Sequence, residues 1–152
     1  MKKTKTKKII TLIFLAILFG VGWSIFGRNE YFYNYNFGTI WGVSLFPLFL
    51  FPSGLIAAYF IYYLFFEKIF RVKNFWLQFV CFSLMYVFFL LIGETIAYYI
   101  FDVRNLGTAQ YPGLPICNCL HAPRWMQTIY LIMGPVYFLS VFFVNKKLIH
   151  RA

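Results

Sequence analysis

Residues 75–101 read FWLQFVCFSLMYVFFLLIGETIAYYIF, an almost wholly apolar run that contains a single carboxylate, Glu94. A helix needs about 20 apolar residues to cross the roughly 30 Å hydrocarbon core of a bilayer, so this run is long enough to span it. Three further runs have the same character: residues 9–26, 39–66 and 126–144. The sequence therefore predicts one all-α membrane domain over residues 1–152, a bundle of four transmembrane helices.

The composition favours a bilayer over water as the solvent. Hydrophobic residues make up 62% of the chain and charged residues 12%, whereas soluble domains average about 45–50% and about 25%. The net charge of +10 raises the question of a nucleic-acid partner. However, five of the fourteen Lys and Arg residues lie in residues 1–8, and none lies inside a long apolar run. Basic residues in the flanks of spans are typical of membrane proteins, so we expect the bilayer and no nucleic acid as a partner.

The basic residues in these flanks also predict the orientation of the spans. One side carries the five N-terminal lysines with Lys68, Arg71, Lys73, Lys146, Lys147 and Arg151, and the other carries Arg28, Arg104 and Arg124, a split of eleven to three among the fourteen. Lys and Arg concentrate on the cytoplasmic side of membrane proteins. We therefore expect both termini in the cytoplasm (N-in, C-in) and a bacterial cytoplasmic membrane as the location. The first span is expected to stay uncleaved, because no A-x-A-like site follows it.

Prolines and glycines mark the places where the helices are expected to pack closely. Pro47 and Pro52 lie in the second run, and each is expected to remove one hydrogen bond inside the helix. In lipid the freed carbonyl groups need other partners, so this helix should face neighbouring helices rather than lipid tails. Gly20 and Gly22 would allow similar close packing of the first helix.

Glu94 is the first candidate functional residue, because ionisable side chains inside a span are rare and often functional. On a continuing helix, Glu94, Tyr98 and Asp102 recur at i, i+4 and i+8 and form one polar stripe. The stripe lies at the outer end of the third span. A structural ion pair or hydrogen bond of Glu94 with an arginine on this side is the favoured interpretation. The alternative is an outward-facing pocket in which Glu94, Tyr98, Asp102, Arg104 and Arg124 bind a ligand or handle a proton.

The stretch PICNCLHAPRW, residues 115–125, is the second candidate. Cys117, Cys119 and His121 stand two apart, and residues two apart share a face in an extended segment. A disulfide within the chain or between two copies is favoured, because the predicted topology puts this loop in the oxidising compartment. A redox-active cysteine pair is an alternative. A copper or zinc site is a weaker one, because soft ligands suit these metals but a fourth ligand is missing. No cofactor is predicted.

The loops at this side of the membrane carry the functional hypothesis. Residues 102–127 are too many for a simple turn, and their apolar side chains predict a folded outer loop. The first outer loop contains the aromatic run EYFYNYNF, residues 30–37. The leading hypothesis is a small non-catalytic accessory protein that binds another membrane protein or an apolar ligand through this aromatic extracytoplasmic face. The alternative is a membrane enzyme or carrier with an outward-facing pocket, which would use the Cys/His loop together with Glu94.

Overall fold

A computed structural model describes the backbone of residues 2–150 and the side chains of residues 6–147. Its long helices are α1 (Lys2–Phe26), α2 (Leu45–Tyr62), α3 (Phe75–Tyr99) and α4 (Arg124–His150). The first of these is followed by a short 3-10 turn, η1 (Arg28–Glu30), and α2 runs on into a π-helical segment, η2 (Tyr63–Ile69). Each long helix, with η2 added to α2, contains a stretch that is long and apolar enough to cross a membrane. The prediction of four candidate spans is confirmed.

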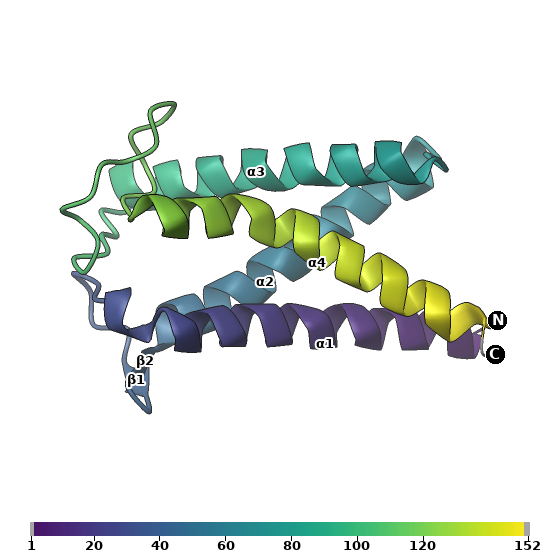
Figure 1. The fold of residues 1–152 in the computed structure, drawn as a ribbon, viewed down its shortest axis with the longest axis horizontal. Coiled ribbons are helices and arrows are strands. Elements are labelled where there is room, and N and C mark those ends of the chain that lie inside the picture. Colours follow the sequence, from purple (N-terminus) through teal and green to yellow (C-terminus); the bar gives the residue numbers. More distant parts are fainter. Residues whose placement is uncertain (1, 151–152) are drawn as a thin grey trace.

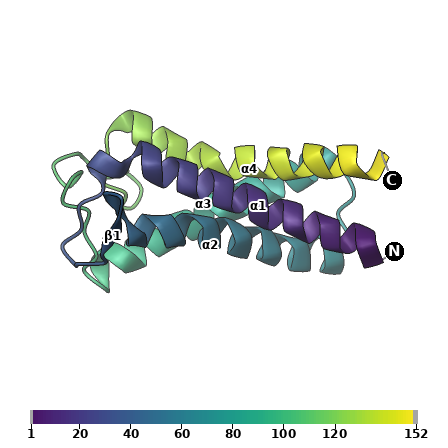
Figure 2. The same ribbon diagram turned by 90° about the horizontal axis from the view of Figure 1, so that it is seen from below.

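The two chain termini lie at one end of the bundle, together with the short connection between α2 and α3 (Figure 1). We call this the terminal end. The opposite end, the loop end, holds the two longer connections, residues 27–44 and residues 100–123. The helices α2 and α3 meet at the terminal end and diverge toward the loop end (Figure 1), and all four helices follow the same long axis in the view of Figure 2.

The second span begins later than the sequence indicates, at Leu45 rather than at residue 39. The preceding residues form a hairpin in which β1 (Thr39–Ile40) pairs antiparallel with β2 (Val43–Ser44). Trp41 and Gly42 form its turn with positive φ angles of 51° and 76°, the backbone geometry of a two-residue hairpin turn. Hydropathy alone does not separate Ile40, Trp41 and Val43 from the helix that follows, which explains the early predicted boundary.

The two prolines of α2 have different roles. Pro47 lies in the first turn of the helix, where backbone N–H groups have no partner inside the helix and a missing N–H costs nothing. The expectation that Pro47 interrupts the helix is therefore wrong. Pro52 does lie inside α2, and it is buried. A Cβ atom on Gly20 of α1 would overlap the Pro52 ring, whereas one on Gly22 would meet nothing within 4 Å. Close packing of α1 on α2 thus depends on Gly20.

Helices α3 and α4 meet at a similar contact between a glycine and a ring. A Cβ atom on Gly134 would overlap the Tyr86 ring. The Tyr86 hydroxyl donates a hydrogen bond of 2.9 Å to the Tyr130 carbonyl, one turn before Pro135 in α4. This bond is a second direct contact between α3 and α4.

Candidate functional site

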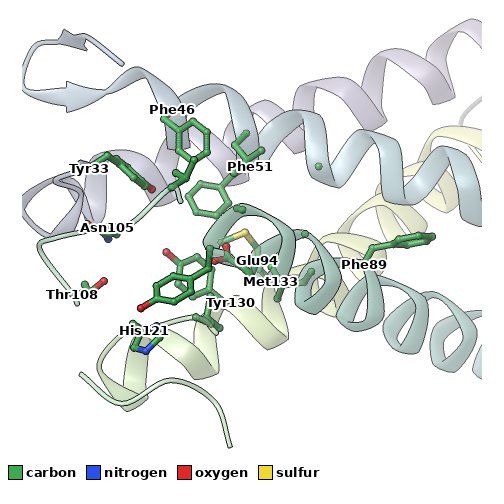
Figure 3. Close-up of a pocket in the computed structure, with 18 of the residues that line it drawn as sticks. Tyr33, Phe46, Phe51, Phe89, Glu94, Asn105, Thr108, His121, Tyr130 and Met133 are labelled. Atoms are coloured by element: carbon green, nitrogen blue, oxygen red, sulfur yellow. The ribbon is translucent and has the colours of Figure 1, made fainter. Parts of the chain in front are cut away.

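A cavity of about 280 Å³ lies at the loop end of the bundle (Figure 3). Its lining comes from α2, α3, α4 and both long connections. Aromatic side chains form much of the wall, and they are Tyr33, Phe46, Phe51, Tyr86, Phe89, Tyr98 and Tyr130. Polar side chains also line it, among them Glu94, Arg104, Asn105, Thr108 and His121. An apolar wall with a few polar groups is the usual composition of a small-molecule site, and this volume is close to the lower end of the usual range, about 300–1,000 Å³.

The predicted polar stripe is shorter than the sequence indicates. Glu94, Tyr98 and Arg104 line the cavity, whereas Asp102 and Arg124 do not. The helix α3 ends at Tyr99, and Asp102 lies beyond it with a positive φ of 50°. Asp102 therefore does not continue the i, i+4 series, and the stripe ends at Tyr98.

Glu94 lacks the ion pair that the sequence favoured. Arg104 pairs instead with Asp102, with 2.6 Å between Nε and Oδ1, and this hydrogen bond raises the pKa of the Arg104 guanidinium. Arg124 is exposed and donates from Nη1 to Gln127 Oε1 at 3.5 Å. Within the part of the chain whose side chains the structure describes, the half-buried Glu94 carboxylate has neither a hydrogen bond nor an ion pair. Its carboxylate is open to the cavity (Figure 3).

The cysteine–histidine stretch separates into two parts in the structure. Cys117 and Cys119 form a disulfide, with Cα atoms 5.0 Å apart, and neither lines the cavity. His121 does line it, and its ring stacks on Tyr98 with 4.8 Å between the centroids. Its Nδ1 atom is buried and has no hydrogen-bond partner among the residues that the structure describes. Among the described residues, no three His, Cys, Asp or Glu side chains come together as metal ligands, so the alternating spacing does not produce the weakly predicted copper or zinc site.

Two tyrosines of the first long connection extend into the bundle. Tyr31 is buried, and its hydroxyl lies 2.7 Å from that of Tyr130. Tyr33 lines the cavity, and its ring stacks on that of Tyr31 at 6.3 Å. Burial raises the pKa of both hydroxyls, and negative charge at Glu94 raises it further. Both groups therefore stay protonated and neutral at physiological pH. In the sequence, the two tyrosines are two residues apart in the aromatic run, and this spacing indicates that they share a face if the segment is extended.

Three amides that the sequence analysis did not single out hold the loop end together. The Asn34 side chain donates to the Asp102 carbonyl at 2.6 Å and accepts from the Arg104 N–H at 2.8 Å. Asn105 Oδ1 accepts from the N–H of Phe32 at 3.0 Å. The buried Gln127 side chain donates to the carbonyls of Pro112 and Leu120 at 2.8 and 3.2 Å. These bonds fix the connections that carry Tyr33, Arg104 and His121 against the cavity.

Comparison of the chain with models of known protein families, with curated proteins and with solved structures finds no match. The cavity and the polar groups that line it are the features from which a function follows.

Proposed function

We propose that this chain is a small multi-pass membrane protein that binds a mainly apolar small molecule in the cavity at its loop end. The observation that carries the proposal is the cavity itself, with an aromatic wall and an unpaired carboxylate. A side chain such as Glu94 is costly inside a span and is usually retained for binding or transport. The protein acts as a ligand-binding accessory subunit of another membrane protein. It is not itself catalytic.

Exposed lining residues support access from the bilayer. Leu50 and Phe89 line the cavity and remain 45% and 41% exposed. Gly54 of α2 and Gly93 of α3 line it and are also exposed. These residues lie on α2 and α3, which diverge toward the loop end (Figure 1). Exposed positions on membrane-spanning helices face lipid, so a ligand dissolved in the bilayer reaches the cavity between these two helices.

The orientation is part of the same proposal: the terminal end faces the cytoplasm of a bacterial cell and the loop end faces outward. The eleven-to-three split of basic residues supports it. Both termini lie at the terminal end, together with the connection that follows Lys68 and contains Arg71 and Lys73 (Figure 1). The folded connection of residues 100–123 then covers the cavity from the extracytoplasmic side.

A membrane carrier or enzyme is the second candidate function. The observation that favours it is that Glu94 and His121 line the same cavity (Figure 3), since such a pair can bind and release protons. The disulfide lies outside the lining, so this candidate gains no redox group from the cysteines.

Photolabelling tests the binding proposal. A small neutral aryl diazirine should label cavity residues of the protein in membranes, and unlabelled isobutylbenzene should compete in a saturable way. Gly93→Leu should suppress this labelling, because position 93 has open space that the new side chain fills. Gly22→Leu is the matched control, since Gly22 is equally open but lies outside this cavity. Equal, non-saturable labelling of both variants and the wild type would contradict the proposal.

A further inference from the structure

The Glu94 carboxyl is an acidic group without a basic partner in the described part of the chain. An isolated ionised carboxylate in an apolar site is strongly unfavourable unless it is paired or protonated. A ligand that can pair with this carboxylate therefore binds more tightly than one that makes apolar contacts alone. The other groups around the carboxylate indicate the chemistry of that ligand.

The charges around the cavity add up to a negative site. Arg104 is the cationic side chain in the lining, and its guanidinium is neutralised by Asp102 at 2.6 Å. The same guanidinium lies 5.0 Å from the centroid of the Tyr98 ring, so it is held against the wall. The lining residues of α2 and α4 carry no charge. The uncompensated acidic group of the lining is Glu94, and its ionised carboxylate attracts a cation.

The remaining wall is also suited to a cation. Rings from several elements surround the cavity, among them Tyr33, Phe46 and Phe51 (Figure 3). Aromatic faces attract ammonium groups, and the attraction is strongest where water is excluded. A carboxylate and aromatic faces together match a protonated amine.

We propose that the ligand of this cavity is a lipophilic organic ammonium ion, whose charged nitrogen binds the Glu94 carboxylate among the aromatic rings. Its apolar body lies toward the opening between α2 and α3, where Leu50 and Phe89 are exposed. The inference rests on the proposed binding function, and it adds the chemical class of the ligand. It also explains why the Glu94 carboxylate has no partner among the described side chains.

A matched pair of probes tests the charge. Benzyldimethylamine, protonated at neutral pH, and isobutylbenzene have nearly the same shape but differ in the charged nitrogen. Each is titrated against diazirine labelling of the cavity in the full chain, reconstituted in neutral lipid. The ammonium should compete at a concentration at least about tenfold lower than the hydrocarbon, because a charge-assisted hydrogen bond exists only for the former. Glu94→Gln should remove this advantage, and Glu94→Asp should retain part of it.

The controls separate this inference from the proposed function. Glu67→Gln makes the same change in η2 at the terminal end, outside the cavity, and should leave both probes unaffected. Thermal unfolding without a probe checks that Glu94→Gln is folded. Equal competition by the two probes in wild type and Glu94→Gln overturns the ammonium assignment while the binding function stands. Absence of saturable cavity labelling overturns both.

Discussion

At the scale of the residue, Gln127 illustrates how one side chain can organise a long connection. It is buried at the start of α4, and its amide N–H groups bond the carbonyls of Pro112 and Leu120. The next residue after Leu120 is His121, which lines the cavity. Leu120 itself has a positive φ of 55°, a conformation that a branched side chain rarely adopts without support from its surroundings. The position of His121 therefore depends on Gln127.

Gln127→Leu should destabilise the protein by about 1–3 kcal/mol, because two buried carbonyl groups lose their donor while the volume changes little. Hydrogen exchange should increase in residues 105–123, and the melting temperature in detergent should fall. Thr128→Val is the matched control. Thr128 is exposed and bonds a carbonyl of its own helix, so its replacement should change stability by less than about 0.5 kcal/mol. An equal effect of the two substitutions would contradict the anchoring role of Gln127.

The candidate site was partly predictable at this scale. Glu94 stands out in any apolar run of this length, and Tyr98 follows from helical spacing, so both were found. Asp102 was wrongly included in the stripe because the aromatic residues around Tyr99 give no sequence signal that the helix ends there. Asn34, Asn105 and Gln127 were missed for a different reason. Asn34 and Asn105 bond residues 68 to 73 positions away, and no local pattern encodes such pairs.

At the scale of the element, the close approach of α1 and α2 depends on one glycine. The buried Pro52 ring occupies the space that a Cβ atom on Gly20 would fill. Ser24 supports the same turn by donating to the Gly20 carbonyl at 2.8 Å. Lipid tails are as apolar as helix surfaces, so the hydrophobic effect does not drive helices together inside a membrane. Small residues at such contacts promote association instead, because they let the two backbones approach closely.

Gly20→Ala should therefore separate the helices and destabilise the protein by about 1–3 kcal/mol, the usual cost of an added methyl group without space. Gly22→Ala should be neutral or slightly stabilising, because its new Cβ has room and alanine favours the helix by up to about 1 kcal/mol. Thermal unfolding of the two variants in one detergent measures the difference. A smaller loss for Gly20→Ala than for Gly22→Ala would refute the contact.

The helices themselves were predictable because a segment that crosses lipid must satisfy its own backbone over a fixed length, which requires a long apolar run. What the sequence did not reveal were the points where an apolar segment stops being helical. Ile40, Trp41 and Val43 are as apolar as the helix that follows, yet they lie in a hairpin. Hydropathy measures the preference for lipid, and the hairpin is decided by backbone conformation at Trp41 and Gly42.

At the scale of the whole molecule, the proposed orientation makes a direct prediction. A cysteine at Trp41, which is 94% exposed at the hairpin tip, should react with a membrane-impermeant maleimide in spheroplasts. A cysteine at Lys73, which is exposed at the terminal end, should react only after permeabilisation. The reason is the basic split, in which each Lys or Arg near an anionic leaflet contributes roughly 1 kcal/mol.

Both substitutions should be made with Cys81→Ala, which removes the cysteine that is not in the disulfide. The parent variant without an added cysteine measures background labelling. The reversed pattern, with Lys73→Cys reactive in intact spheroplasts and Trp41→Cys protected, would invert the proposed topology and place the cavity at the cytoplasmic surface.

The bonds between the two long connections set an order of events during synthesis. Phe32 and Asn34 bond residues that follow them by 68 to 73 positions. At about 5–20 residues per second, the ribosome takes roughly 3–15 s to make those partners. During that interval α1 and α2 can already pack together at Gly20 and Pro52. The segment that contains Tyr31 and Tyr33 cannot yet form its hydrogen bonds, because the residues that it bonds have not been synthesised. The cavity therefore forms only after α3 and the first part of α4 have been made, because Tyr130 and Met133 of α4 also line it.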